Sequence, residues 1–379
     1  MIRVIDVKVD EFRVTIPFNF KILGLNDIYI DSIIDSIEDT LNLKQILGER
    51  QKIIGGKDGY DSIIAWGRNE KDYIYLMYSL TNPNMKFSLK FGGRALAIYL
   101  MNYKYLYHED TNVYEILKLL DSRFSIYIDE ELERVRLSRL DIAIDLIDEN
   151  LIVNDLYKKI ISNEIIVQNK RNSIIEIQRN MGKGINTETM YFNKRSSNSF
   201  LRIYDKKVQQ IDTKGFDFNT AINCENWTRF ECELKHEYAH EMTYKIVDCT
   251  DEEEFLELLI KVFCDCFKFK TIIDYDGDKE ILGDTDFYMN IKNLADNHCK
   301  ILNSPIRKPL TDFEEKYMNL FENGTMSYFE MFRKAYGDDE LDELFEQIKL
   351  DLKTNKVKMN NKHMKMIEQN RGSVAKLNL

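Results

Sequence analysis

Charged and apolar residues alternate with a period of two in three segments of the chain, 139–145, 202–206 and 229–235. In a β-strand this alternation places the charged side chains on one face and the apolar side chains on the other. We therefore expect a sheet with one apolar face and one polar face. The side chains predicted on the polar face are Arg139, Asp141, Asp145, Arg202, Tyr204, Lys206, Arg229, Glu231, Glu233 and Lys235.

This polar face has two interpretations. For any single strand, the simpler one is an amphipathic antiparallel strand whose polar side chains face water. Three such strands bring several carboxylates, guanidinium groups and a tyrosine onto one face, and burying them is costly unless a ligand or partner offsets the cost. We therefore interpret the face as a functional site.

The rest of the sequence alternates strand-like and helix-like segments. Period-two and short apolar runs predict strands at 2–20, 62–68, 73–78, 87–91, 135–147, 173–179, 189–206 (a hairpin) and 227–235. Helical spacing predicts helices at 28–47, 94–101, 112–122 (capped by Thr111 or Asn112), 153–162, 236–247 and 252–267. From about residue 310 the pattern is helical, at 313–321, 328–336 and 341–352.

The order strand, helix, strands, helix occurs twice, which predicts two pseudo-repeated halves at about 1–130 and 131–303. A turn signal at Asn303-Ser304-Pro305 marks the next boundary. We therefore expect an α+β fold in which a central, largely antiparallel sheet is built from these two halves. Residues 1–303 would form a catalytic domain and residues 304–379 a helical C-terminal region with a basic tail.

The net charge of −11 argues against a nucleic-acid partner at long range, but a local basic segment can override it. Such a segment is 194–207, with Lys194, Arg195, Arg202, Lys206 and Lys207. No apolar run approaches the ~18 residues of a membrane span, and the N-terminus lacks the apolar core of a secretory signal. The six cysteines are then expected to be free thiols. We expect a cytoplasmic protein.

The polar face has the residue types for phosphodiester chemistry. Carboxylates that converge from two strands are hard oxygen ligands suited to Mg²⁺ or Mn²⁺. A tyrosine beside such an ion, flanked by an arginine and a lysine, can attack a phosphodiester and form a covalent phosphotyrosine. The candidate metal ligands are Asp141, Glu231, Asp145 and Glu233.

Three motifs resemble those of the replication initiation factor (Rep_trans) family. They are Ser138–Asp145, the hairpin Met190–Ser196 running into Arg202–Lys206 (RIYDK), and Trp227–Lys235. The strand end at Gly92-Gly93-Arg94 also fits, and the resemblance extends over about residues 60–250. The family includes rolling-circle replication initiators of plasmids and phages and related relaxases of conjugative elements.

The resemblance implies a metal-dependent enzyme that nicks one strand of origin DNA through a tyrosine and rejoins it at termination. The tyrosine falls on Tyr204, which would hold a 5′-phosphotyrosine and leave a free 3′-hydroxyl. We expect catalytic roles for Tyr204, Arg202, Lys206 and Arg229, with Mg²⁺ or Mn²⁺ as cofactor. DNA contacts are expected from Arg139, Lys194, Arg195, Lys207 and Lys235. The expected partners are duplex and single-stranded origin DNA, a host helicase and a second copy of the chain, with no membrane.

Two positions depart from the family's pattern. Asn193-Lys194 stands where the family usually has Gly-Ser, and the turn is expected to survive because Asn also tolerates left-handed geometry. Gln209 stands where a glutamate often follows, so no catalytic role is assigned to it. Tyr191 is a second candidate nucleophile. The alternatives to a replication initiator are a conjugative relaxase of the same family and a non-catalytic origin-binding factor that keeps the fold.

One motif points to a different chemistry. His236-Glu237-Tyr238-Ala239-His240 matches the H-E-x-x-H pattern of zinc metalloproteases, but no third ligand in a recognisable context follows it. We therefore expect the first turn of a helix with surface histidines. Cys264 and Cys266 lie two residues apart on a predicted helix, where side chains diverge, so they are not expected to clip a metal ion.

A nickase needs base contacts that select its origin in addition to phosphate contacts. The arginines and lysines of the polar face are assigned to the scissile phosphate, so we expect the C-terminal region to recognise the duplex. The alternative is a solvated, frayed end. The candidates are Arg307, Lys308, Arg333, Lys334, Lys356, Lys358, Lys362, Lys365 and Arg371.

Overall fold

The structure is a computed structural model, and it describes residues 4–18, 27–128, 131–169, 175–180, 186–276, 279–296, 320 and 325–354. The chain divides into two compact units, Met1–Arg307 and Lys308–Leu379. Their boundary lies close to the turn signal at 303–305.

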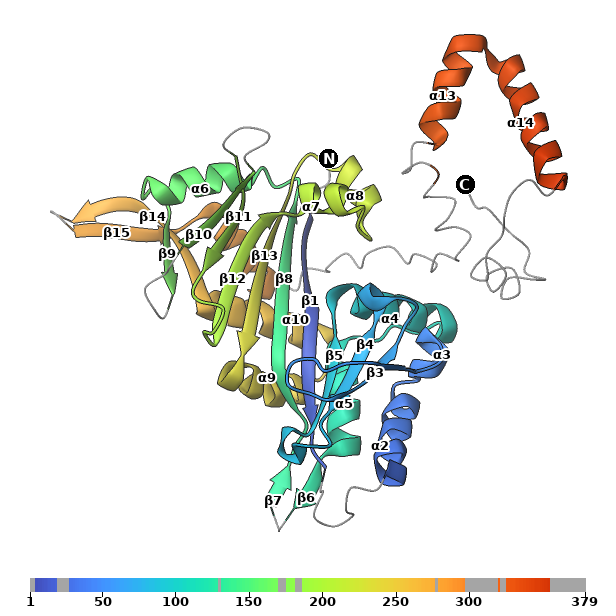
Figure 1. Ribbon diagram of the computed structural model, residues 1–379. Coiled ribbons are helices and arrows are strands. Elements are labelled where there is room, and N and C mark those ends of the chain that lie inside the picture. The colour runs from blue at the N-terminus through green and yellow to red at the C-terminus, as the bar shows by residue number, and fades with distance from the viewer. Residues whose placement is uncertain are drawn as a thin grey trace. The chain divides into compact units, whose positions relative to one another are not determined.

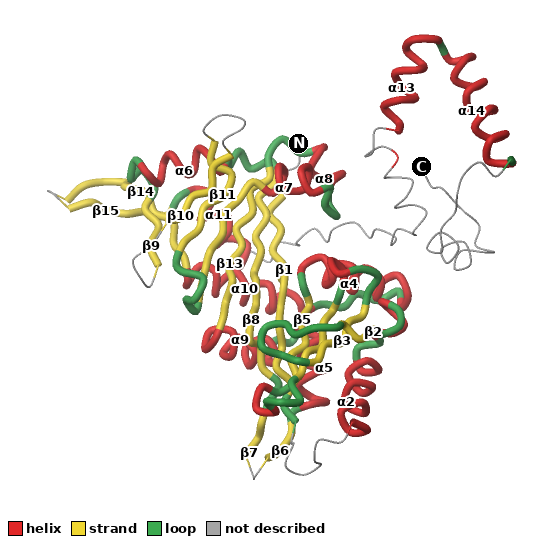
Figure 2. Tube along the Cα trace, in the orientation of Figure 1, coloured by secondary structure: helices red, strands yellow, loops and turns green. Residues whose placement is uncertain are grey.

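Within the described residues of the first unit, ten strands form one antiparallel sheet (Figures 1 and 2). Its order is β10-β11-β12-β13-β8-β1-β5-β4-β3-β2. The strands are β1 (Val4–Ile16), β2 (Gln51–Ile53), β3 (Ser62–Trp66), β4 (Ile74–Tyr78), β5 (Phe87–Phe91), β8 (Arg136–Ile147), β10 (Ile175–Asn180), β11 (Asn186–Phe192), β12 (Ser199–Asp205) and β13 (Trp227–Lys235).

The strand order contains a repeat. From the centre outwards, one half runs β1-β5-β4-β3-β2 and the other runs β8-β13-β12-β11-β10. The two halves meet where β1 pairs with β8, from Val4 opposite Ile147 to Thr15 opposite Arg136. The predicted α+β fold, with an antiparallel sheet built from two pseudo-repeated halves, is therefore confirmed.

Helices cover the apolar face of the sheet, and α9 and α10 are seen behind β8 and β13 in Figure 1. Leu140, Ile142 and Ile144 of β8 are fully buried there, and Phe230 of β13 meets Phe263 of α10 edge to face. Burial of each such side chain contributes about 1.5–3 kcal/mol. This packing fixes which side chains of β8 and β13 face the opposite, polar side. The helices in this core include α4 (Gly93–Tyr107), α5 (Val113–Phe124), α9 (His236–Asp248) and α10 (Glu252–Cys266).

Side-chain caps start several of these helices. Asn112 accepts a hydrogen bond from the Glu115 backbone N–H, and the Glu115 side chain accepts one from the Asn112 N–H, which forms a capping box. Asp251 caps α10 by accepting from the Glu254 N–H. A cap of this kind contributes about 1 kcal/mol. The predicted helix start at Asn112 is confirmed.

Smaller elements surround the sheet. The helices are α2 (Asp27–Thr40), α3 (Leu43–Leu47), α6 (Val153–Ile161), α7 (Lys206–Thr213), α8 (Phe218–Asn223) and α11 (Asp286–Asp296), with short 3-10 helices η1 (Glu70–Asp72) and η2 (Pro83–Met85). A second sheet has the order β15-β14-β9, with β9 (Ile166–Asn169), β14 (Phe267–Asp276) and β15 (Lys279–Asp284). β6 (Ile126–Ile128) and β7 (Glu131–Glu133) form a separate hairpin.

The sequence did not predict the second sheet or the β6–β7 hairpin. The helix predicted at 252–267 ends at Cys266 because β14 begins at Phe267. There Phe267 and Phe269 are buried while Lys268 is exposed, an alternation that follows the helical pattern without a Gly or Pro between them. The predicted helix at 313–321 lies outside the described residues except for residue 320.

In the second unit, α13 (Thr325–Tyr336) and α14 (Asp338–Lys353) are joined at Gly337, whose φ of 106° favours glycine. They contact each other through Phe329 and Phe345, whose ring centroids are 5.0 Å apart. Arg333 forms ion pairs with Glu330 and Asp338, and Lys334 pairs with Glu330. These two predicted DNA-contacting cations are therefore matched by local acids, and the other candidates of this region lie outside the described residues.

Every helix in the described part of the chain is too short or too polar to span a membrane. The cysteines that the structure describes are free thiols, as predicted. They are Cys224, Cys232, Cys249, Cys264 and Cys266.

Candidate active site

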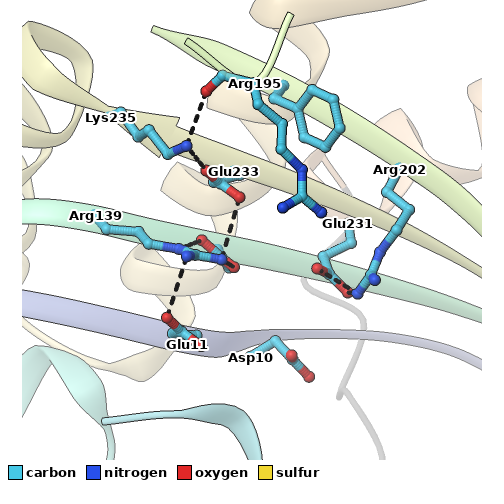
Figure 3. A pocket seen from close by; sticks show the side chains of 10 residues that line it. Asp10, Glu11, Arg139, Arg195, Arg202, Glu231, Glu233 and Lys235 are labelled. Atoms are coloured by element: carbon cyan, nitrogen blue, oxygen red, sulfur yellow. Dashed lines mark hydrogen bonds and ion pairs between the residues drawn. The ribbon is translucent and has the colours of Figure 1, made fainter. Parts of the chain in front are cut away.

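The polar face of the sheet is hollowed into a pocket of about 200 Å³ across β12, β13, β8 and β1 (Figure 3). Apart from one phenylalanine its lining is charged, so it suits a charged ligand rather than an apolar one. The lining residues are Asp10, Glu11, Arg139, Asp141, Arg195, Phe200, Arg202, Glu231, Glu233 and Lys235.

Tyr204 lies at the edge of this pocket, on the strand next to Glu231. The register of β12 and β13 places Tyr204 opposite Arg229 and Arg202 opposite Glu231. The Tyr204 hydroxyl donates a hydrogen bond to Oε2 of Glu231 at 3.2 Å. The Arg202 guanidinium donates to both oxygens of the same carboxylate, at 2.6 and 2.7 Å, and lies 4.5 Å from the centroid of the Tyr204 ring. The phenol, one carboxylate and one guanidinium therefore form a single contact group.

Tyr204 is 6% exposed. Burial raises the pKa of its phenol well above the usual range, although the neighbouring Arg229 opposes that rise. The phenol is therefore protonated at neutral pH in this arrangement, and it needs a proton acceptor before it can attack. Glu231 is placed to be that acceptor, since its oxygen is within hydrogen-bond distance.

Arg229, which lies opposite Tyr204 on the neighbouring strand, forms a buried ion pair with Asp145. Arg229 Nε and Nη2 donate to the two Asp145 oxygens at 2.6 Å each, and Nη1 donates to Asp10 at 2.7 Å. Lys8 lies 3.1 Å from Asp145 Oδ2. Burial alone would raise the pKa of Asp145, but Arg229 and Lys8 outweigh it and hold that pKa below its usual range. Both Asp145 oxygens are thus held by cations, and Asp145 does not line the pocket that holds the other three candidate metal ligands. Its role as a metal ligand stays a prediction.

A cluster of carboxylates surrounds Arg139 at the other end of the pocket. Arg139 donates to the two Asp141 oxygens at 2.8 and 2.6 Å and lies within 3.3 Å of Glu11 and 3.1 Å of Glu233. Lys235 pairs with Glu233. Burial raises the pKa of Asp141 to about 8; Arg139 opposes the rise, and the charges of Glu11 and Glu231 add to it. Arg139 and Lys235, predicted to contact DNA, are held on carboxylates here.

The carboxylates of the pocket fit a hard divalent cation in their donor type. Asp141, Glu231 and Glu233 lie within one pocket, and carboxylate oxygens are the donors that such a cation prefers. One buried oxygen of Glu11 and one of Glu233 accept no hydrogen bond and are held only by ion pairs, with Lys90 and Arg139 and with Lys235. Among the described residues, no three His, Cys, Asp or Glu side chains already converge in a metal-binding arrangement. A metal ion would therefore have to displace some of the arginine and lysine contacts.

Lys206 is buried beside the same tyrosine, with its Nζ 5.7 Å from the Tyr204 ring centroid. It is the first residue of α7, which Asp205 caps by accepting from the Val208 N–H. Burial and the charge of Arg229 lower the pKa of Lys206 to about 8, against the opposing effect of Asp10 and Asp145. An amine with this pKa can exchange a proton near neutral pH.

The other predicted DNA-contacting residues lie on the hairpin and on α7. Lys194 and Arg195 are exposed in the turn between β11 and β12. Asn193 has φ of 69°, so this position does adopt the left-handed geometry expected of it. Lys207 donates to the backbone carbonyls of Cys224 and Glu225 at the end of α8. Its ammonium group is therefore occupied within the chain.

Sequence reasoning missed Asp10, Glu11, Lys8 and Phe200. The β1–β8 pairing shifts register between Val9 and Glu11, which indicates a bulge that turns two consecutive acids towards the pocket. The signal was present in the sequence. The polar residues of β1 alternate through Asp6, Lys8 and Asp10 and then change phase at Glu11.

The H-E-x-x-H motif forms the first turn of α9, as expected. His236 and Glu237 are exposed, and His240 is partly buried. Burial and the nearby Arg136 lower the pKa of His240. The motif takes no part in the pocket.

Comparisons with known proteins bear on the family and the fold of this chain. A family model described as replication initiation factor matches residues 135–278. The solved structure of a rolling circle replication initiator protein from Geobacillus stearothermophilus matches 81% of this chain and 100% of its own, with a TM-score of 0.55 and 21% identity. An immunity protein of a type VI secretion system from Pseudomonas aeruginosa matches 69% of this chain and 91% of its own, with a TM-score of 0.14 and 9% identity, too low to support an argument.

No curated protein matches the sequence. The matched family segment contains β8, β12 and β13, the strands that carry the tyrosine and most of the pocket's charges. The resemblance to replication initiation factors is therefore confirmed, and the fold is that of the Geobacillus initiator.

Proposed function

We propose that this chain, which resembles the replication initiation factors in its matched segment and in its fold, initiates rolling-circle replication by nicking one strand of origin DNA through Tyr204. One observation carries the proposal: the Tyr204 hydroxyl donates to Glu231 at 3.2 Å, and Arg202 holds the same carboxylate. A non-catalytic DNA-binding protein has no need for a buried phenol paired with a proton acceptor next to a charged pocket.

The chemical step follows from these contacts. Glu231 takes the phenol proton as the Tyr204 oxygen attacks the scissile phosphorus. The bond between phosphorus and the 3′-oxygen breaks, and the 3′-oxygen leaves with the electron pair and gains a proton from water. The products are a 5′-phosphotyrosine and a free 3′-hydroxyl. Rejoining is the same reaction in reverse.

Two arginines serve this step in different ways. Arg202, which lines the pocket, offers donors that stabilise charge developing on the phosphate oxygens. Arg229 is buried, so it acts through its positive charge on the environment of Tyr204 and through its hold on Asp145 and Asp10. Lys206 supplies a further cation, or a proton, close to the tyrosine.

A divalent cation is part of the proposal. Asp141, Glu231 and Glu233 are the residues that would hold Mg²⁺ or Mn²⁺. When bound, such an ion supplies Lewis-acid stabilisation of the phosphate. We expect nicking to stop when EDTA removes divalent ions and to return with Mg²⁺ or Mn²⁺. Nicking that persists in EDTA would refute the metal requirement.

The nucleophile is tested on supercoiled plasmid that carries the cognate origin. Wild-type protein should convert it to nicked circles and remain covalently attached to one strand. Tyr204→Phe removes only the hydroxyl, so DNA binding should survive while nicking and covalent attachment disappear. Tyr191→Phe is the matched control, because Tyr191 lies on the same face and is the second candidate nucleophile. Loss of nicking in Tyr191→Phe with normal nicking in Tyr204→Phe would transfer the assignment to Tyr191.

The partners implied by the resemblance, a host helicase and a second copy of the chain, stay predictions. So does the choice between a replication initiator and a conjugative relaxase, because both use the same nicking step.

A further inference from the structure

Two residues that line the charged pocket, Phe200 and Arg195, form a stack with Tyr191. The rings of Tyr191 and Phe200 are stacked, with centroids 5.7 Å apart and planes inclined by 21°. The Arg195 guanidinium lies 5.7 Å from the centroid of Phe200. Figure 3 shows Arg195 extending towards the same pocket as Arg202.

The position of Phe200 is not explained by packing in the apolar core. The apolar side chains of β12, Leu201 and Ile203, point into the core, whereas Phe200 falls on the polar face opposite Glu233 and is still only 6% exposed. It is covered by Tyr191, which is half-buried, and by Arg195, which is exposed. Phe200 is thus an apolar ring among charged side chains, covered by one aromatic and one cationic side chain. Protein surfaces on which nucleobases stack have this composition.

The platform lies within one nucleotide's reach of the tyrosine. Tyr191 is opposite Arg202 in the β11–β12 ladder, and Arg202 is two residues from Tyr204 on the same face. Neighbouring strands are ~4.8 Å apart and residues i and i+2 are ~6.7 Å apart along a strand. The backbone of Tyr191 is therefore roughly 8 Å from that of Tyr204.

The cationic groups around the platform match a DNA backbone. In the described part of the chain, the Arg195 guanidinium makes no ion pair, and it lies 5.7 Å from the centroid of the Phe200 ring. It is therefore available for a phosphate without first leaving a carboxylate, unlike Arg139 and Arg202. Arginine combines ring stacking with bidentate phosphate binding, which suits a site for a single nucleotide.

We propose that Tyr191, Phe200 and Arg195 form a subsite that stacks one unpaired base flanking the scissile phosphate, with Arg195 on the adjoining phosphate. This inference rests on the proposed function, since it places DNA at Tyr204. The site takes single-stranded DNA, because the faces of a base inside a duplex are covered by the neighbouring base pairs and cannot stack on a side chain. It also gives Tyr191 a role that needs its ring and not its hydroxyl.

The test compares two variants of Tyr191 in a Tyr204→Phe background, in which DNA is not cleaved. The probe is oligothymidylate of about 12 nucleotides, a length within known single-strand site sizes, since stacking tolerates any base. Tyr191→Ala should weaken binding by roughly 5- to 150-fold, and Tyr191→Phe should bind within about 3-fold of the parent. Tyr127→Ala, an exposed tyrosine of β6, is the matched control and should bind like the parent.

An abasic oligonucleotide of the same length separates stacking from other effects of the alanine. If the ring stacks on a base, the abasic probe binds weakly to the parent and Tyr191→Ala weakens it no further. Equal losses in Tyr191→Ala and Tyr191→Phe, an equal alanine effect on both probes, or no binding of oligothymidylate to the parent would each overturn the subsite. Thermal melting of each variant checks that it is folded.

The outcome is distinguishable from failure of the nickase proposal. Covalent nicking by wild-type protein reports on Tyr204, whereas binding of the two uncleaved probes reports on the platform. Nicking with no base-dependent effect of Tyr191→Ala refutes the subsite alone. A base-dependent effect without nicking refutes the nickase and leaves the stacking site.

Discussion

The two halves of the sheet have the same strand order but use their polar faces differently. In the C-terminal half, the third strand from the centre, β12, presents Arg202 and Tyr204 beside the charged pocket. In the N-terminal half, the third strand, β4, presents Met77, which is fully buried in a small apolar cluster with Tyr60 and Ile63. The loop between β2 and β3 supplies Tyr60.

This difference shows how one architecture can provide stability in one half and chemistry in the other. An apolar cluster is stabilised by burial alone. A charged face is tolerated mainly because its buried charges are paired, and the C-terminal half supplies the pairs Arg229–Asp145, Arg202–Glu231 and Arg139–Asp141. The site is therefore held together by ion pairs that a substrate or cation can exchange.

Breaking the most buried ion pair should give the largest difference in unfolding free energy between variants of the two halves. Arg229→Met leaves Asp145 buried without its main partner and should cost about 3–5 kcal/mol of unfolding free energy. Arg13→Met in the N-terminal half removes a pair with the half-exposed Asp58 and a hydrogen bond to Ser88, and should cost about 0.5–2.5 kcal/mol. Urea unfolding of both variants measures this. Equal losses of unfolding free energy would show that the two polar faces do not differ in how much their ion pairs stabilise the fold.

A variant in the apolar cluster should lower stability without affecting nicking. Met77→Ala opens a cavity in the N-terminal half and should cost about 2–5 kcal/mol, because Met77 is fully buried. Nicking per folded molecule should be unchanged, since Met77 does not line the pocket. Differential scanning calorimetry and the plasmid assay at a temperature where the variant is folded provide the two measurements. A loss of nicking without a loss of stability would contradict the division between the halves.

The buried amine of the C-terminal half should make stability depend on pH. The pKa of Lys206 falls from 10.5 to about 8 on folding, so below pH 8 the fold buries a charged lysine, and above 10.5 the lysine is neutral in both states. Stability from this group therefore rises between pH 8 and 10.5, by up to ~3 kcal/mol. Lys206→Met should be more stable than wild type at pH 7, with a gap that closes towards pH 10.5.

Urea unfolding at both pH values tests this expectation. Lys158→Met, an exposed lysine of α6, is the matched control and should show no pH-dependent gap. A gap for Lys206→Met that does not change with pH would mean that the fold does not lower the pKa of this lysine.

The smallest effects separate two lysines that the sequence grouped together. Lys194 is exposed, so Lys194→Ala should leave stability unchanged and reduce the log–log salt slope of single-strand binding by about 0.7. Lys207 donates to two backbone carbonyls, so Lys207→Ala should cost about 0.5–1.5 kcal/mol and leave the slope unchanged. Fluorescence titration over a salt series measures the slopes. The reverse pattern would restore Lys207 as a DNA contact.

Much of the fold could be predicted because apolar and polar residues alternate in the middle of its central strands. In the middle of β8, β12 and β13 every second residue is apolar, and the structure buries these residues in the core: Leu140, Ile142, Ile144, Leu201, Ile203, Phe230, Cys232 and Leu234. The β6–β7 hairpin and β9 were missed because three or four residues carry too little periodicity. The second sheet was missed because β14 follows α10 without a turn.

The candidate site was predictable in its residue types but not in its pairings. The sequence grouped Asp145 with Asp141 because both fall on one face, yet only the register of β13 shows that Arg229 holds Asp145. Lys207 was assigned to DNA from its position in a basic segment, but its partner is the carbonyl of Cys224, 17 residues further along the chain at the end of the next helix. Whether a charged side chain is available for a ligand depends on partners from other strands or helices. The local sequence pattern does not identify these partners.

The central pair of strands, β1 and β8, has a consequence for how the chain is made. One edge of β1 pairs with β5, which belongs to the same half of the sheet. The other edge can pair only after β8, which ends at Ile147, has been synthesised. At synthesis rates of about 5–20 residues per second, that edge is unpaired for roughly 3–11 s after Phe91 is made. Open edges invite pairing with other chains, and charged side chains discourage it. We therefore expect Asp6, Lys8 and Asp10 to reduce aggregation of the newly made chain, a role separate from the contacts of Lys8 and Asp10 in the finished site.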